Sequence, residues 1–130
     1  MTGRRQPTVR MPLAATALAY LAGLFDGEGS IIKHSPPPSR GRPVWRITIT
    51  GTSPELREFL APLGGQFYRK VRYSPRHAEA YNWTLERQAD CQIFLEAVLP
   101  YLHLKRGRAF DALADLREKW GEIVQLEMRA

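Results

Sequence analysis

The order of hydrophobic and polar residues predicts a chain that combines helices with strands. Residues 15–27 carry apolar side chains at helical spacing, with Leu18, Leu21 and Phe25 on one face, so we expect a helix that packs on a core. Residues 44–50 alternate strictly between apolar and polar, which is typical of a strand with one buried face. Both kinds of element therefore contribute to one core.

The remaining segments complete an α+β pattern. Ser53 and Pro54 are suited to the N-cap and the first position of a helix, which stops at Gly64 and Gly65. The same reasoning assigns strands to 30–34, 66–73 and 78–87, a hairpin loop to 35–43, and helices to 90–99 and 108–128, the last packing through Phe110, Leu113, Leu116, Trp120, Ile123 and Val124. The order α-β-β-α-β-β-α predicts an antiparallel four-stranded sheet with helices on its apolar face and an open polar face.

One position in the first strand does not follow the alternation. Lys33 falls on the core face together with Ile31, whereas Ile32 and His34 fall on the open face. Either the Lys33 side chain extends from the end of the strand to solvent, or a bulge shifts the register. The sequence leaves both alternatives open.

Small residues form a second stripe on the first helix. Ala15, Ala19, Gly23 and Gly27 recur every fourth residue and leave one helix face almost bare of side chains. Two backbones can approach each other closely along such a face. We therefore expect this stripe to be a second buried face and the interface between two copies of the chain.

A turn rich in glycine and acidic residues follows this helix. Gly27 and Gly29 suit a helix C-terminus, and Glu28 lies at its negative end, beside exposed carbonyl oxygens. Carboxylate and carbonyl oxygens are the ligands of hard divalent cations. The turn is therefore either a metal site or a glycine cap with solvated acids.

Residues 21–29, LAGLFDGEG, resemble the signature of the LAGLIDADG homing endonucleases at six of nine positions. The resemblance implies a single-motif, homodimeric protein with a four-stranded saddle sheet for DNA, over residues of about 12 to 128. It also implies that Glu28 and Gly27 hold a metal and that Glu28, Lys105 and Thr52 are catalytic. Thr52 stands in a region where family members often carry a glutamine that positions water.

The open face and the proline-rich loop would then form the DNA interface. Cations and hydrogen-bonding groups on such a surface can enter a major groove, although a solvated sheet face has a similar composition. The predicted interface consists of Ile32, His34, Arg40, Arg42, Arg46, Thr48, Thr50, Tyr68, Lys70, Arg72, Asn82 and Thr84.

The implied activity is site-specific cleavage of double-stranded DNA at a long, pseudo-palindromic target, in the service of intron or intein mobility. The expected cofactor is Mg²⁺, with Mn²⁺ as a substitute, and Ca²⁺ should support binding with little cleavage. Cleavage of both strands needs two metal centres, and one chain carries one Glu28, so we expect a homodimer. Two alternatives remain, an RNA-binding splicing cofactor (maturase) and a catalytically inactive DNA-binding protein of the same fold.

Composition adds limits to this interpretation. The 130 residues fit a single domain, 12–130, after a flexible basic tail, 1–11. The net charge of +6 indicates a polyanionic partner such as nucleic acid, although ribosomal and membrane-surface proteins have similar charge. The single cysteine, Cys91, excludes an internal disulfide and favours a reducing, DNA-containing compartment, cytoplasmic or organellar, over secretion. Histidines 34, 77 and 103 lack the spacing of a metal site, and the apolar run 11–25 is too short to span a bilayer.

Overall fold

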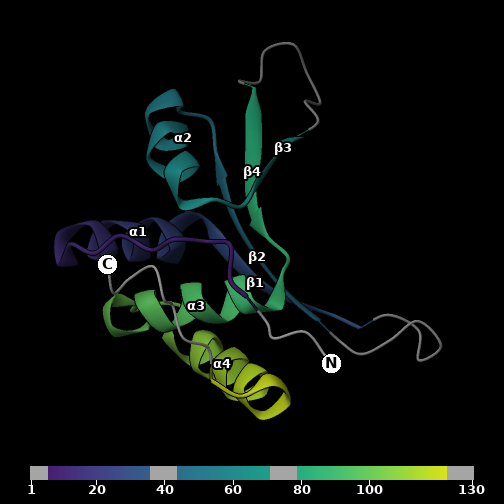
Figure 1. Cartoon of the computed structure of the whole chain (residues 1–130). Coiled ribbons are helices and arrows are strands. Elements are labelled where there is room, and N and C mark those ends of the chain that lie inside the picture. The colour runs from purple at the N-terminus through teal and green to yellow at the C-terminus, as the bar shows by residue number, and fades with distance from the viewer. Residues whose placement is uncertain (1–5, 36–43, 71–78, 123–130) are drawn as a thin grey trace.

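The structure is a computed structural model that describes residues 6–35, 44–70 and 79–122. Its elements follow the predicted order (Figure 1). They are α1 (Ala15–Glu28), β1 (Gly29–His34), β2 (Val44–Gly51), α2 (Pro54–Leu60), the 3₁₀ turn η2 (Ala61–Leu63), β3 (Gln66–Lys70), β4 (Ala80–Leu85), α3 (Gln88–Val98), the 3₁₀ turn η3 (Leu99–Tyr101) and α4 (Arg106–Trp120). The predicted α+β class is confirmed.

The four strands form one antiparallel sheet in the order β1-β2-β4-β3. Ile49 lies opposite Gly29 on one side and opposite Trp83 on the other, so β2 and β4 occupy the middle of the sheet. Helices α1, α3 and α4 lie to one side of these strands in Figure 1. The opposite face of the sheet is open, as the alternation predicts.

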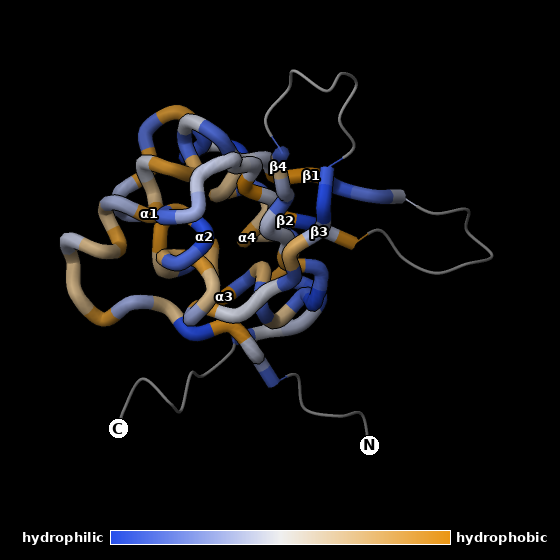
Figure 2. Tube along the Cα trace, turned by 90° about the horizontal axis from the view of Figure 1, so that it is seen from above, coloured by the Kyte–Doolittle hydropathy of each residue, from blue (hydrophilic) through white to orange (hydrophobic). Residues whose placement is uncertain are grey.

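The core lies between this sheet and the helices. Trp83 of β4 and Phe25 of α1 both pack against Phe94 of α3, with ring centroids 5.7 and 5.0 Å from it. In β2 the predicted inward residues Trp45, Ile47 and Ile49 are buried. In Figure 2, hydrophobic and hydrophilic residues follow one another along the strands and helices. The polar–apolar pattern therefore placed the core face of the sheet correctly.

The boundaries of α2 follow from local chemistry. The Ser53 hydroxyl oxygen accepts the N–H of Leu56 at 3.1 Å, which caps the helix. After η2 the chain turns through Gly64 and Gly65, whose φ values of 101° and 79° favour glycine. A Cβ at Gly65 would also lie 2.7 Å from the indole nitrogen of Trp83. The predicted cap and the predicted stop are both confirmed.

The last helix is shorter than predicted and buries different residues. Gly121, at φ 78°, ends α4 after Trp120, whereas the predicted helix continued to residue 128. Phe110 and Trp120, predicted to face the core, are 64% and 44% exposed. The buried stripe consists instead of Ala109, Ala112, Leu113 and Leu116, because the two alanines allow α4 to pack closely. Residues 123 and 124 lie outside the described part of the chain.

Residues 6–11 were expected to belong to a flexible tail, and this expectation is wrong for the segment from Thr8 to Met11. Val9 and Met11 are fully or almost fully buried in the core. The buried carboxylate of Asp90 accepts the N–H groups of Thr8 and Val9 and the Thr8 hydroxyl. The alternation of Val9 and Met11 around Arg10 was the signal of a short extended segment. Residues 1–5 lie outside the described chain.

The structure also decides the two alternatives for Lys33. The register between β1 and β2 runs without a bulge from Gly29 to His34. The Lys33 side chain extends over the Trp45 ring, 5.4 Å from its centroid, to an ion pair with Asp115 of α4 at 3.8 Å. Lys33 therefore reaches solvent from the end of the core face. Among the described helices, none is long and apolar enough to cross a bilayer.

Candidate functional site

The end of α1 places Glu28 at the junction of a helix and a strand. Gly29 follows directly in extended conformation, and its N–H bonds to the carbonyl of Phe25. A Cβ at Gly29 would lie 2.7 Å from that carbonyl oxygen and would overlap the Phe25 ring, so this position requires glycine for space. The Glu28 side chain is exposed. The tight junction therefore presents an exposed carboxylate at the start of the sheet.

Asp26 connects this junction to the start of α4. Its carboxylate accepts the N–H groups of His103, Leu104 and Lys105 at 2.8, 3.1 and 3.0 Å. The Lys105 ammonium in turn donates to the Asp26 carbonyl at 2.7 Å. We call this set of contacts the Asp26 clamp. It holds the Lys105 ammonium against the last turn of α1, two residues before Glu28.

The role of Asp26 was missed by the sequence analysis, which treated the motif acids as metal ligands or solvated groups. Asp26 is instead a structural acceptor for the backbone of a distant segment. The signal that could have found it is that Asp26 is identical to the residue at this position of the family signature. A carboxylate that accepts several backbone N–H groups is a strong fixed contact.

The donor atoms at the junction fit a hard cation in part. Glu28 offers a carboxylate, and the end of α1 offers carbonyl oxygens at its negative pole, including that of the predicted ligand Gly27. Within the described residues, no three His, Cys, Asp or Glu side chains gather as a metal site. A divalent ion here would therefore need further oxygen ligands, which phosphates or a second chain can provide.

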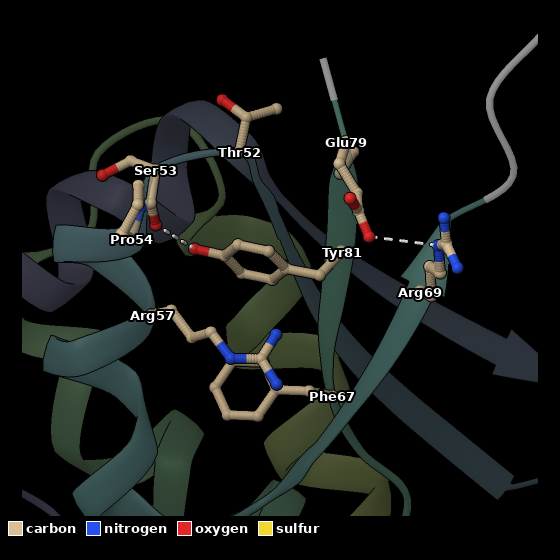
Figure 3. A pocket seen from close by; sticks show the side chains of 9 residues that line it. Thr52, Ser53, Pro54, Arg57, Phe67, Arg69, Glu79 and Tyr81 are labelled. Atoms are coloured by element: carbon tan, nitrogen blue, oxygen red, sulfur yellow. Dashed lines mark hydrogen bonds and ion pairs between the residues drawn. The ribbon is translucent and has the colours of Figure 1, made fainter. Parts of the chain in front are cut away.

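Thr52 lies close to this end of the sheet without touching the predicted catalytic groups. Within the described chain, no hydrogen bond joins it to Glu28 or Lys105. Thr52 lies at the rim of a pocket of about 440 Å³ between α2 and the β3–β4 pair (Figure 3). In that pocket the Arg57 guanidinium stacks on Phe67 at 4.2 Å, and the Tyr81 hydroxyl donates to the Ser53 carbonyl at 3.0 Å. Burial raises the pKa of Tyr81, against the weaker opposing effect of Arg57.

The open face of the sheet gathers most of the predicted DNA-binding residues. Its centre is a hollow of about 500 Å³ that we call the sheet hollow. Its lining consists of Ile32, Arg46, Thr48, Thr50, Tyr68, Lys70, Asn82, Thr84 and Glu86. His34 is exposed at the end of β1, beyond this lining. The predicted contacts Arg40, Arg42 and Arg72 lie outside the described residues.

Two hydrogen bonds organise the sheet hollow. The Thr50 hydroxyl lies 2.7 Å from the Asn82 side-chain oxygen and donates to it. The Tyr68 hydroxyl donates to the Glu86 carboxylate at 2.9 Å, and this bond raises the pKa of Tyr68, so the hydroxyl stays protonated. Glu86 was not among the predicted residues of this interface, although it continues the alternation of Asn82 and Thr84.

Thr84 is less available than predicted. It lines the sheet hollow but is only 3% exposed. Tyr68 lies opposite Asn82, and Thr84 lies between Asn82 and Glu86 on the same face, so the bond from Tyr68 to Glu86 passes over Thr84. In this arrangement of Tyr68 the Thr84 side chain is covered, and its contact with DNA stays a prediction.

The small-residue stripe of α1 is exposed in a single chain. Ala15, Ala19, Gly23 and Gly27 all face solvent, whereas Leu21, Ala22 and Phe25 on the opposite side are buried. A Cβ placed at Gly23 or at Gly27 would meet nothing within 4 Å. The chain itself therefore does not require these two glycines for its own packing.

Comparison with known proteins bears on the whole fold. No known family model and no curated protein matches the sequence. The homing endonuclease I-CvuI, solved with its target in the presence of Ca, superposes with a TM-score of 0.61 at 20% identity over 79% of this chain. The archaeal intron-encoded homing endonuclease I-Vdi141I, complexed with DNA, gives 0.60 at 17% identity over 79%. The group I intron-encoded enzyme I-CeuI, also complexed with DNA, gives 0.53 at 14% over 84%.

This chain has the LAGLIDADG homing endonuclease fold. The predicted resemblance is thereby confirmed at the level of the fold. The chain spans 67%, 65% and 56% of the lengths of I-CvuI, I-Vdi141I and I-CeuI. In this LAGLIDADG fold, the nine-residue motif forms the end of α1 and the start of β1, and the sheet hollow lies at the centre of the open sheet face.

Proposed function

We propose that this chain is a site-specific, divalent-metal-dependent endonuclease that cleaves double-stranded DNA as a homodimer. The observation that carries the proposal is the Asp26 clamp, which fixes a cation, Lys105, beside the helix end that presents Glu28. The fold shared with DNA-bound homing endonucleases supports the same conclusion. The exposed sheet hollow supplies a surface for the duplex.

Each group at the junction has a separate role in phosphodiester hydrolysis. Glu28 and the Gly27 carbonyl would hold a divalent ion, and such an ion would supply activation of water and neutralisation of charge on the phosphate oxygens. The Lys105 ammonium stabilises negative charge that develops at the phosphate. The described residues place no ion pair between Lys105 and Glu28, so the charge of Lys105 is not cancelled by that acid. Thr52 orients water from the end of β2.

A pair of chains completes the enzyme. Two strands of a duplex need two centres, and the exposed stripe on α1 allows two copies to pack about a two-fold axis. That packing brings two Glu28 side chains together over the duplex. The two sheets then lie along DNA on either side, with Arg46 and Lys70 as exposed cations on each.

Selection of cleaved sequences from a randomised duplex library in the presence of Mg²⁺ tests the proposal. We expect a single long, pseudo-palindromic site. Cleavage in Mg²⁺ but binding alone in Ca²⁺ would match the metal assignment. Enrichment of a bound site without any cleavage would identify a DNA-binding protein that has lost catalysis. Binding to structured RNA in preference to every duplex would point to a splicing cofactor.

Gly23→Leu should convert the dimer to a monomer. A Cβ at Gly23 meets nothing within the chain, so the larger side chain leaves the fold intact but separates two helices that touch through this stripe. Sedimentation should give half the wild-type mass. Gly107→Leu is the matched control, because Gly107 is equally exposed and equally open on α4. A dimeric Gly23→Leu protein would place the interface on another surface.

Lys105→Ala should slow cleavage by about 10²-fold while leaving DNA affinity nearly unchanged, because its charge acts on the transition state. The comparison is Arg106→Ala, which removes an exposed cation one residue further along. That variant should instead weaken binding to all sequences and lower the salt dependence of affinity by about one phosphate contact. Single-turnover cleavage and salt titration of binding measure the two effects. Equal loss of affinity in both variants would assign Lys105 to phosphate binding alone.

A further inference from the structure

Glu86 is an acidic residue on the surface that is proposed to bind DNA. It lines the sheet hollow together with the cations Arg46 and Lys70. A carboxylate that faces phosphates repels them and weakens binding to every sequence. Its position on the open face therefore suits contact with base edges, where a carboxylate can accept hydrogen bonds.

Arg46 of β2 lies level with Glu86, the first residue after the end of β4. Ile47 of β2 pairs with Leu85, the last residue of β4, in an antiparallel register, and continuing that register by one residue places Arg46 level with Glu86. Neighbouring strands are about 4.8 Å apart. Both side chains line the same hollow, and a hydrogen-bond donor therefore stands beside an acceptor.

The two groups keep most of their hydrogen-bonding capacity for a ligand. Within the described chain, no ion pair of 4.0 Å or less joins Arg46 to Glu86. Glu86 uses one carboxylate oxygen to accept the Tyr68 hydroxyl, which fixes the side chain and leaves the second oxygen available. Tyr68 is thus a positioning residue for this acceptor.

We propose that Arg46 and Glu86 together read one G·C base pair in each half-site, Arg46 donating to guanine and Glu86 accepting from the paired cytosine. In the major groove a G·C pair presents the guanine N7 and O6 acceptors next to the cytosine N4 amino donor. A donor beside an acceptor matches that order across one base pair. The inference rests on the proposed DNA binding and adds the base specificity of one position.

Binding profiles of every single-base substitution of the selected site, measured in Ca²⁺, test this inference without requiring cleavage. Wild type should prefer G·C at one symmetric position in each half. Glu86→Gln should reduce the preference for G·C over T·A there by about tenfold, because an amide pairs bidentately with adenine and a carboxylate does not. Arg46→Ala should relax the choice at the same position in both halves.

Two further variants separate base reading from general effects. Tyr68→Phe should move the preference in the same direction as Glu86→Gln but by a smaller factor, since Glu86 remains and loses only its anchor. Glu79→Gln removes the same charge from the opposite face, where Glu79 pairs with Arg69, and should leave every base preference unchanged.

The outcomes distinguish this inference from the proposed function. If wild type binds a defined site and Glu86→Gln retains its base profile, Glu86 does not read the sequence and the inference fails. The same conclusion follows if Glu86→Gln and Arg46→Ala change different positions. If wild type binds no duplex with specificity, the proposed function fails first.

Discussion

Glu28→Gln should abolish DNA cleavage while leaving folding and DNA binding intact. The side chain is exposed, and the described structure gives it no hydrogen bond or ion pair, so the substitution disturbs no internal contact. It removes the negative charge that would hold a divalent ion. Loss of a catalytic ion costs several kcal/mol of transition-state stabilisation, which corresponds to a decrease of about 10³-fold or more in the single-turnover rate.

The measurement is single-turnover cleavage of the selected duplex, with affinity determined in Ca²⁺ for the same protein. Glu58→Gln on α2 is the matched control, because it neutralises another exposed glutamate of the same chain. The control should cleave at the wild-type rate. Cleavage by Glu28→Gln within tenfold of wild type would remove Glu28 from the metal site.

Asp90→Ala should lower the free energy of unfolding by about 3 kcal/mol. The Asp90 carboxylate is 3% exposed and accepts the N–H groups of Thr8 and Val9 as well as the Thr8 hydroxyl. Removing it leaves the buried N–H of Val9 and the partly buried N–H of Thr8 without an acceptor, and an unsatisfied buried donor costs about 1–3 kcal/mol. The buried side chains of Val9 and Met11 then lose their attachment to the core.

Thermal and urea unfolding of the variants measure this effect, with an expected decrease in Tm of roughly 10 °C. Asp90→Asn should cost much less, because an amide oxygen still accepts the N–H groups and the Thr8 hydroxyl can reverse its role. Asp111→Ala provides the control, since Asp111 is an exposed aspartate on α4. Equal stability of the Asp90→Ala and Asp111→Ala proteins would show that the contacts of Asp90 with Thr8 and Val9 contribute nothing to stability.

The sequence predicted features that depend on neighbours along the chain. The alternation around Ile47 indicated the buried face of β2, and Ser53 with Pro54 indicated the start of α2. Both signals depend only on residues that are close together in the sequence. They are therefore readable without knowledge of the distant chain.

Features that depend on distant partners were not predictable in the same way. The place of Lys33 on the core face depends on Asp115, which lies 82 residues later in the sequence. The Lys33 ammonium is 3.8 Å from the Asp115 carboxylate. The carboxylates of Asp90 and Asp26 accept backbone N–H groups of segments about 80 residues distant in the sequence. A helical pattern also could not show that Ala109 and Ala112 of α4, rather than Phe110, are buried. The choice depends on how closely two helices approach.

The sequence predicted the functional groups of the candidate site but not the residues that position them. The motif indicated Glu28, and the resemblance indicated Lys105, which the structure places at the same helix end. The Asp26 clamp and Glu86 were absent from the prediction. Both are acids whose partners come from other segments, and an acid in a sequence carries no sign of what it accepts.

The Asp26 clamp sets which positions tolerate replacement. Asp26 binds the main-chain N–H groups of residues 103 and 104, and both side chains at these positions are exposed. Any residue except proline supplies the same N–H, so positions 103 and 104 should accept broad variation with little change in stability. Asp26 itself should accept almost none. Random libraries intended to alter contacts near the end of α1 can therefore vary residues 103 and 104 freely, while Asp26, which binds their backbone, is kept constant.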